Sequence, residues 1–589
     1  MQMFKSMKAL RTISALLSLA LVFNACKKDD PLPLAPTLTA GAATNGKVGD
    51  VVKITATLNA PGGLKTLTVL KNGQVFESKA YAGETTAAYT KDYTVEALPV
   101  NSVVTFTFQA TDNSNQTSTL ATQVITVSAI PAKQIVEVKG VLEGNISWTK
   151  DKIYKLVGFV RLGEDLRAQN TAPTKTGVLT IQAGTVIIGD RASKATLVIQ
   201  RGSQIIANGT LAEPIVFTSE RAVGEREAGD WGGLVICGRA LTNIALIAQG
   251  VGELEGSYSA FYGGSNPADN SGSLKYVRVE YAGIPINPNQ EVNSFTFGSV
   301  GSGTTMEYLQ ASFGGDDSFE WFGGSANAKY LVAYRGLDDD FDIDNGFSGS
   351  LQFGIGIRGA TIADQSGSNG FEIDNDGGGT ANTPITAPIM SNFSLIGAKE
   401  NNSTAINPLF QNGMHIRRGP QPKIFNTFVT GYPNGIFLDP TGSVSVLDNA
   451  SRGTIVMNNV VVSGVAGWGT NNFGAGAGLP NGFSIRDVNT AATPVALPNI
   501  GTQRPSVWFA AQPGNKLITD WITTGISATL FSAGRPMFTV GAGANTLTTG
   551  GTTPAGAFFT ATDFVGAFKT TDWTAGWANF APQTTDYSK

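Results

Sequence analysis

Short runs in which apolar and polar residues alternate occur along most of the chain, and glycines or polar turns separate them. Such alternation over roughly four to eight residues is typical of half-buried strands, because successive side chains of a strand point to opposite faces. The runs fall into two sets with different spacing. The pattern therefore predicts an all-β protein with two structured domains.

The first set of strands lies in residues 36–130 and includes VVKITATLNA, LKTLTVLKNGQVFESKAY and SVVTFTFQATD. Asn72 and Gly73 separate two of its alternating runs, and Asn-Gly between strands is a strong hairpin signal. About 95 residues of this kind predict an immunoglobulin-like β-sandwich. Because the segment contains neither Cys nor Trp, we expect a disulfide-free form without chemistry of its own.

From residue 139 onward the strands repeat differently. The segments LTIQAGTVIIGD (179–190) and LVIQRGSQIIANG (197–209) share the pattern L-x-I-Q-x-G, followed by a second short apolar strand. A repeat of about 20–30 residues that cannot bury its apolar face alone predicts the stacked coils of a right-handed parallel β-helix. We assign the β-helix to residues 139–470. We expect final coils and a cap over 471–589, since an open end would expose a sheet edge.

Three later coils carry the related motifs FEWF, FDID and FEID, which begin at Phe319, Phe341 and Phe371. In a strand, residues i and i+2 share one face, so the aromatic residues are predicted to point inward. The acids that follow them, Glu320, Asp342 and Glu372, are then predicted to point outward. Equivalent positions of stacked coils lie about 4.8 Å apart. The sequence therefore predicts a ladder of carboxylates on the outer surface.

Residues 316–376 contain twelve acidic and three basic side chains, a net charge of −9 in a chain whose total is −4. Carboxylates at this spacing repel one another unless a bound cation compensates them. Ca²⁺ suits such a ladder because it accepts several oxygen ligands in flexible geometry. The predicted ligands are Asp316, Asp317, Glu320, Asp338, Asp340, Asp342, Asp344, Glu372, Asp374 and Asp376. The alternative is a solvated acidic face, or acids that cap turn amides.

A catalytic interpretation uses the same face. Polysaccharide lyases and glycoside hydrolases with this fold use acidic clusters, joined by Ca²⁺ and a basic residue or arranged as carboxylate pairs. The candidate acids are Asp339, Asp340, Asp342 and Glu372. Arg335 and Arg358 lie in the same coils, and HIRRG (415–419) is a further basic group. We expect His415, the only histidine, to be a polar turn residue, and we favour a non-catalytic protein because a fold alone carries no activity.

The N-terminal sequence predicts a cellular location. Residues 1–25 combine Lys5, Lys8 and Arg11 with the short apolar run ISALLSLALVF, as signal peptides do. Cys26 follows Ala25 and resembles the lipidated cysteine of bacterial lipoproteins; an ordinary signal peptide is the alternative. Residues 26–35 would be the lipidated tether, and their KKDD run resembles a surface-export signal. We expect a lipid-anchored protein on the cell-surface side of the outer membrane.

Composition removes several classes of function. A net charge of −4 without a basic stripe argues against nucleic acid as a partner. Two cysteines and one histidine exclude a disulfide framework and a cysteine-rich zinc site. The partners that remain are the membrane, through Cys26, and a glycan or another surface protein.

Several long phrases resemble a family of Bacteroidetes surface lipoproteins with right-handed parallel β-helix repeats, for which no reaction is established. They include DWGGLVICGRA, YGGSNPADNSGSLKYVRVEYAG, GDDSFEWFGG, DDDFDIDNGFSG and DWTAGWANFAPQ. The resemblance covers about residues 140–583 and implies fold and location, but no catalytic residue. We therefore expect an outer-membrane lipoprotein with a calcium-stabilised β-helix that serves in binding, adhesion or structure. The alternative is a polysaccharide lyase or glycoside hydrolase acting at the acidic face.

Overall fold

The computed structural model describes residues 31–165, 175–244, 251–288, 290–468, 485–489, 495–527, 529–531, 535–541 and 546–588. The chain divides into two compact units, Met1–Pro131 and Ala132–Lys589. The expected signal peptide and Cys26 lie outside the described residues. Within the described ranges, no helix combines the length and the apolar character that a membrane span requires.

The first unit is a β-sandwich with one sheet of three strands and one of five, in the orders β1-β3-β6 and β2-β8-β7-β4-β5. The strands are β1 (Thr37–Ala40), β2 (Thr44–Gly46), β3 (Val51–Asn59), β4 (Leu64–Lys71), β5 (Gln74–Ala80), β6 (Thr86–Thr94), β7 (Val103–Asp112) and β8 (Ala121–Val127). Leu67, Phe106 and Phe108 are fully buried between the sheets. Asn72 and Gly73 have φ values of 50° and 83° in the β4–β5 turn, as the predicted hairpin requires.

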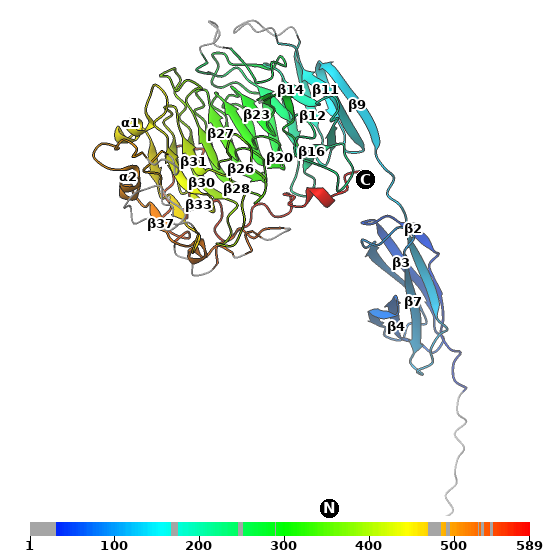
Figure 1. The fold of residues 1–589 in the computed structure, drawn as a ribbon. Coiled ribbons are helices and arrows are strands. Elements are labelled where there is room, and N and C mark those ends of the chain that lie inside the picture. The colour runs from blue at the N-terminus through cyan, green and yellow to red at the C-terminus, as the bar shows by residue number, and fades with distance from the viewer. Residues whose placement is uncertain are drawn as a thin grey trace, which may run out of the picture. The chain divides into compact units, whose positions relative to one another are not determined.

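The second unit is a parallel β-helix whose strands stack in three columns, and the prediction of this fold is confirmed (Figure 1). The first column joins β9 (Gln134–Leu142), the first half of β11 (Lys152–Leu162), β13 (Val186–Gly189) and β16 (Ile215–Ser219). The second column joins β10 (Gly144–Trp148), β12 (Gly177–Ile181) and β15 (Gln204–Asn208). Each coil cannot bury its apolar face alone, and stacking supplies the missing surface.

Five longer strands then run through both of these columns in one piece. They are β20 (Gly272–Glu280), β24 (Thr305–Ser312), β26 (Asn327–Tyr334), β28 (Ser350–Ile357) and β30 (Ile389–Ile396). Each bends where one residue takes a left-handed conformation: Tyr276, Tyr308, Tyr330, Phe353 and Asn392 have φ between 50° and 62°. The first four rings stack on one another with centroids 4.3 to 5.0 Å apart. Contacts between these rings hold a conformation that aromatic residues otherwise avoid.

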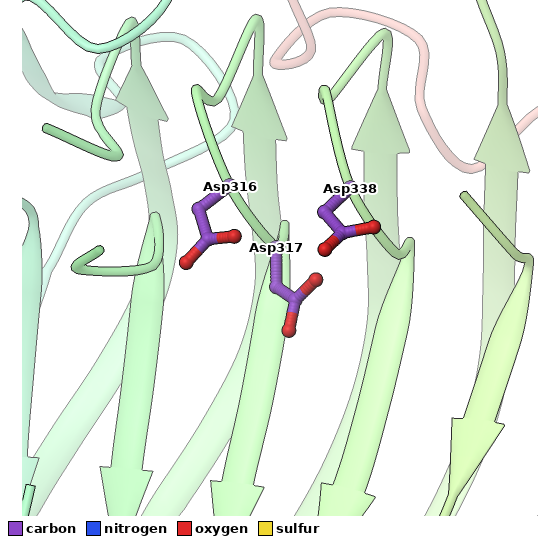
Figure 2. A group of neighbouring side chains, drawn as sticks. All are labelled: Asp316, Asp317 and Asp338. Atoms are coloured by element: carbon purple, nitrogen blue, oxygen red, sulfur yellow. The ribbon is translucent and has the colours of Figure 1, made fainter. Parts of the chain in front are cut away.

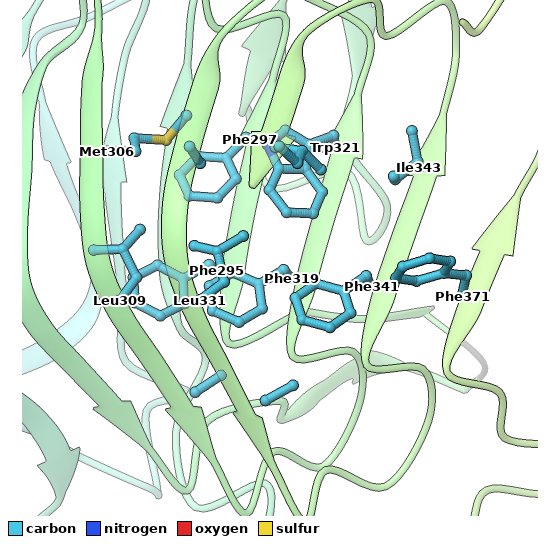
Figure 3. Packing of buried hydrophobic residues seen from close by; sticks show 14 of the residues in the cluster. Phe295, Phe297, Met306, Leu309, Phe319, Trp321, Leu331, Phe341, Ile343 and Phe371 are labelled. Carbon is cyan, nitrogen blue, oxygen red and sulfur yellow. The ribbon is translucent and has the colours of Figure 1, made fainter. Parts of the chain in front are cut away.

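The third column carries the FEWF-type motifs. It joins the second half of β11, β14 (Thr196–Ile199), β17 (Leu234–Cys237), β23 (Phe295–Gly298), β25 (Phe319–Phe322), β27 (Phe341–Asp344), β29 (Phe371–Ile373), β31 (Asn412–Ile416) and β34 (Asn434–Leu438). Phe319 pairs with Phe341, which pairs with Phe371, so the predicted register is confirmed. All three rings are fully buried, and they line the interior of the coils (Figure 3).

The last coils use β32 (Lys423–Phe425), β33 (Phe428–Thr430), β35 (Val456–Asn458), β36 (Val461–Ser463) and β37 (Lys516–Ile518). Two short helices, α1 (Val446–Ser451) and α2 (Pro505–Ala511), lie at this end with the 3-10 turn Trp521–Thr524 (Figure 1). Two segments, one between β17 and β20 and one between β20 and β23, each add a small antiparallel hairpin, and together they are called the insertion below. The hairpins are formed by β18 (Gly252–Glu253), β19 (Phe261–Tyr262), β21 (Pro285–Asn287) and β22 (Gln290–Glu291).

Residues 551–588, called the return segment below, do not form a terminal cap. We expected final coils and a cap over 471–589, but this segment runs back along the side of the β-helix toward its first coil. Three side-chain amides of the coils each form two hydrogen bonds with one residue of the return segment. In each pair the amide nitrogen donates to the backbone C=O, and the amide oxygen accepts from the backbone N–H. The pairs are Asn426–Thr552, Gln352–Thr560 and Gln310–Asn579. At its end, the backbone N–H of Lys133 donates to the carbonyl of Ser588 (3.1 Å).

Candidate acidic cleft

The outward face of the third column forms the floor of a cleft of about 680 Å³. The ladder faces outward from the coils, as predicted, and Glu255, Glu291 and Asp364 from neighbouring segments partly enclose it. Eleven carboxylates line the cleft: Glu255, Glu291, Asp316, Asp317, Glu320, Asp338, Asp342, Asp344, Asp364, Glu372 and Asp374. Among the described residues, two cationic side chains, Arg417 and Arg418, line it with them. The cleft therefore concentrates negative charge in a partly enclosed space.

The ladder itself has the predicted order. Glu320 pairs in register with Asp342, Asp342 with Glu372, and Glu372 with His415. Strand alternation places these side chains opposite the buried aromatic stripe. Glu320 is only 9% exposed, because the inserted hairpins rise over this end of the ladder.

Three groups of carboxylates converge closely enough to hold a cation. They are Asp316–Asp317–Asp338, Asp317–Glu320–Asp342 and Asp339–Asp342–Glu372, and within each group one oxygen per residue lies within 4.8 Å of the others. Figure 2 shows the first group, which comes from the turns before β25 and β27 in adjacent coils. Asp317 and Asp342 each belong to two groups. Oxygens Oδ1 of Asp338 and Asp342 are buried without a hydrogen-bond donor, so each is free to bind a cation.

Burial and mutual repulsion favour protonation of these acids. Burial raises the pKa of Asp317 and Asp342 well above the usual range, and the charges of Asp316 and Glu320 raise them further. Burial raises the pKa of Asp338 to about 7, although a hydrogen bond from Ser366 acts to lower it. Without a cation these acids therefore favour the protonated form, and a bound cation would displace the protons.

One end of the ladder has a different electrostatic environment. Burial raises the pKa of Glu372, but His415 and Arg417 outweigh it and the net shift is downward. Arg417 lies 2.9 Å from both Glu372 and Asp374, and Arg418 lies 2.7 Å from Asp374. His415 lies 3.2 Å from Glu372 and from Asp439. Burial lowers the pKa of His415, but its two carboxylate partners outweigh burial and the net shift is upward. The expectation of a turn histidine is wrong, because His415 is the rung of the ladder after Glu372, inside β31.

Asp340 is not part of the cleft, although the sequence made it both a predicted ligand and a candidate acid. It points into the fold, where its Oδ1 lies 2.9 Å from Arg358 Nη1 and both side chains have no exposed surface. The hydroxyl of Tyr432 donates to its other oxygen (3.1 Å). The second candidate base, Arg335, also lies away from the cleft, over the ring of Tyr334.

Asp339 and Asp376 serve mainly as acceptors for backbone amides. Asp339 accepts from the N–H of Asn369 and joins the third carboxylate group without lining the cleft. Asp376 accepts from the N–H of Gly378 (2.9 Å) and of Thr380 (3.1 Å), so it caps its own turn, as the alternative interpretation allowed. The other eight predicted ligands all line the cleft.

Sequence reasoning missed Glu255, Glu291 and Asp364, which also line the cleft. Glu255 and Glu291 belong to the insertion, and Asp364 lies in the loop between β28 and β29. None of them repeats from coil to coil, so the periodic signal that revealed the ladder could not reveal them.

A model of the family described as pectate-lyase like β-helix domains matches residues 140–481. No curated protein matches the chain.

Among solved structures, the family 28 exopolygalacturonase of Yersinia enterocolitica is 12% identical; the match covers 78% of this chain and 100% of that one, with a TM-score of 0.18. The catalytic domain of a GH87 α-1,3-glucanase in complex with nigerose is 11% identical, with 78% and 90% covered and a TM-score of 0.20. The fibronectin(III)-like modules of Clostridium thermocellum CbhA are 20% identical over 15% of this chain and 95% of theirs, with a TM-score of 0.12. At these identities and TM-scores, the likenesses say nothing about substrate or reaction.

Proposed function

The chain belongs to the family of pectate-lyase-like β-helix domains, and from this premise we propose that it is a binding protein whose acidic cleft holds divalent cations, Ca²⁺ in particular. The observation that carries the proposal is the convergence of eleven carboxylates and two guanidinium groups in one cleft. Buried like charges at this density are costly unless a cation or protons neutralise them. Three carboxylate groups with converging oxygens supply the ligands.

The donor set favours a hard cation. Among the described residues that line the cleft, the ligand atoms are carboxylate, amide and hydroxyl oxygens, with no histidine or cysteine. Ca²⁺ takes six to eight oxygens at variable geometry, whereas Zn²⁺ prefers nitrogen and sulfur ligands. Neighbouring groups share Asp317 and Asp342, so bound ions would share ligands along the helix axis.

Calorimetric titration of the metal-free protein with Ca²⁺, together with thermal melting, tests the proposal. At a free Ca²⁺ concentration of 100 times Kd, one ion adds about 2.7 kcal/mol to the free energy of unfolding, and EDTA removes this gain. The substitutions Asp317→Asn and Asp342→Asn each weaken binding because they remove a shared ligand. Glu307→Gln, on another face, is the matched control. No heat of binding and no shift in melting temperature would refute the proposal.

Carbohydrate cleavage is a second candidate, and one observation favours it. Asp342 and Glu372 are adjacent rungs of the ladder whose pKa values are displaced in opposite directions, as a general acid and its ionised partner require. Arg417 and Arg418 line the same cleft and could bind an acidic sugar. Incubation with neutral and uronate polysaccharides distinguishes hydrolysis, which releases reducing ends, from elimination, which also creates unsaturated uronates. Loss of either product in Glu372→Gln would assign the activity to this pair.

We also propose that Cys26 carries the lipid anchor, which would hold the protein at the outer membrane and present the cleft to glycans or surface proteins. The support is the sequence of residues 1–30. Mass spectrometry of the N-terminal peptide and membrane fractionation test this proposal. Cys26→Ala should release the protein from the membrane fraction, and surface proteolysis of intact cells distinguishes the outer face from the periplasmic one. An unmodified Cys26 in the mature protein would contradict it.

A further inference from the structure

The insertion sits on the β-helix through apolar contacts. Its residues Leu254, Tyr258, Ala260, Tyr262 and Val292 pack in one buried cluster with Val198, Val235, Cys237 and Phe322 of the coils. This packing brings Glu255 and Glu291 to the rim of the acidic cleft. The insertion therefore adds two negative charges where the cleft is already crowded with them.

A second, smaller cavity of about 10 Å³ lies where the insertion meets the wall. Glu255, Glu291 and Asn293 line it from the insertion, and Glu320 lines it from β25 of the coils. A space of this size holds roughly one water molecule or one small ion. It lies beside the three carboxylate groups described above, which contain neither Glu255, Glu291 nor Asn293.

Asn293 supplies an independent sign of a missing ligand. It is 4% exposed, and its Nδ2 donates to Glu320 and to Thr296 Oγ1 (3.5 Å). Its Oδ1 is buried and has no partner. A buried carbonyl oxygen without a donor is costly, and a cation satisfies it as well as a hydrogen bond does. Asparagine oxygen and carboxylates together form a typical Ca²⁺ ligand set.

We propose that a divalent cation, with Ca²⁺ the best fit, binds between Glu255, Glu291 and Asn293 of the insertion and Glu320 of β25, and so fastens the insertion to the cleft. This inference rests on the proposed cation binding and concerns a further site, which shares Glu320 with the group Asp317–Glu320–Asp342. The apolar cluster holds the insertion in place, and the cation cancels the repulsion between the acids of the insertion and Glu320. Cation binding would then set how firmly the insertion covers that end of the cleft.

Hydrogen exchange of the full-length protein, with and without Ca²⁺, measures this fastening. At about ten times Kd, Ca²⁺ should slow exchange in the hairpin strands β18, β19, β21 and β22 about tenfold where exchange requires local opening. The double variant Glu255→Gln/Glu291→Gln should lose this slowing, because two charged ligands are gone while the shape is kept. Glu253→Gln, which removes a charge from the same hairpin but not from the cavity, should retain it.

The outcomes separate this inference from the proposed function. If Ca²⁺ binds and raises the melting temperature but exchange in β18, β19, β21 and β22 does not change, the fastening is refuted and the cleft remains a cation site. Full slowing in the double variant refutes the assigned ligands. Absence of any Ca²⁺ binding refutes both. Loss of slowing in the double variant, with calorimetric binding at the other groups retained, supports the site.

Discussion

Replacement of Asp340 tests whether this residue stabilises the core and takes no part in cation binding. Asp340 and Arg358 form an ion pair with Oδ1 and Nη1 2.9 Å apart and neither side chain exposed. Arg358 also donates to the carbonyl of Leu337 (3.0 Å), and Tyr432 donates to Asp340. Asp340→Asn keeps the shape of the side chain but removes the charge. It therefore leaves a buried guanidinium group without its counterion.

Removal of one partner of a buried ion pair costs about 3–5 kcal/mol, because the other charge stays in a medium that cannot solvate it. Replacement of both partners by apolar residues of similar volume is often neutral. We therefore expect Asp340→Asn to lower the free energy of unfolding by about 3–5 kcal/mol. The double variant Asp340→Leu/Arg358→Met should cost less than either single change, since neither charge remains buried.

Urea unfolding followed by tryptophan fluorescence measures these changes in the β-helix alone. All eight tryptophans lie between Trp148 and Trp577, and the sandwich has none, so its unfolding does not contribute. The single variant should bind Ca²⁺ as the parent does, because Asp340 does not line the cleft. A cost below about 1 kcal/mol for Asp340→Asn, or its loss of Ca²⁺ binding, would refute the assignment of Asp340 to the core.

Three further predictions concern the apo protein, the core and the return segment. Burial raises the pKa of Asp338 to about 7 from about 4 in the unfolded chain, so its contribution is present below pH 4 and is lost as pH rises through 7. The melting temperature in EDTA should therefore fall between about pH 4 and 7, and saturating Ca²⁺ should abolish the fall. Phe319→Ala, in a fully buried stack with rings 5.0 and 5.5 Å away, should cost about 3–5 kcal/mol in urea unfolding, and a cost near zero would contradict the stacking. Gln352→Ala removes both hydrogen bonds to Thr560 and should cost about 1–3 kcal/mol and speed proteolysis of residues 551–588; unchanged proteolysis would contradict this role.

The part of the fold that repeats could be predicted from the sequence. Phe319, Phe341 and Phe371 recur at strand spacing with an acid after each, so alternation and stacking suffice to give the inward stripe, the ladder and the register. The sandwich could be predicted for a related reason, since the Asn-Gly turn fixes one hairpin and alternation gives the others.

What could not be predicted depends on contacts between residues far apart in the chain. The run DDDFDIDNG gives no sign that Asp340 turns inward, because its partner Arg358 comes from the next coil. His415 was expected to be a turn residue, yet pairing with Glu372 places it in a strand. The return segment has no periodicity, and the three amide pairs described above that hold it to the coils join residues 126 to 269 positions apart.

The backbone contact between Lys133 and Ser588 joins the first coil to the last described residue. Synthesis of the protein proceeds from Lys133 toward Ser588, so the flank along β20 to β30 stays open until residues 551–588 have been made. The aromatic rings of Tyr276 and Tyr308 remain uncovered until Trp577 reaches them. A truncation that removes residues 551–588 would therefore expose this flank of the β-helix and yield an aggregation-prone product.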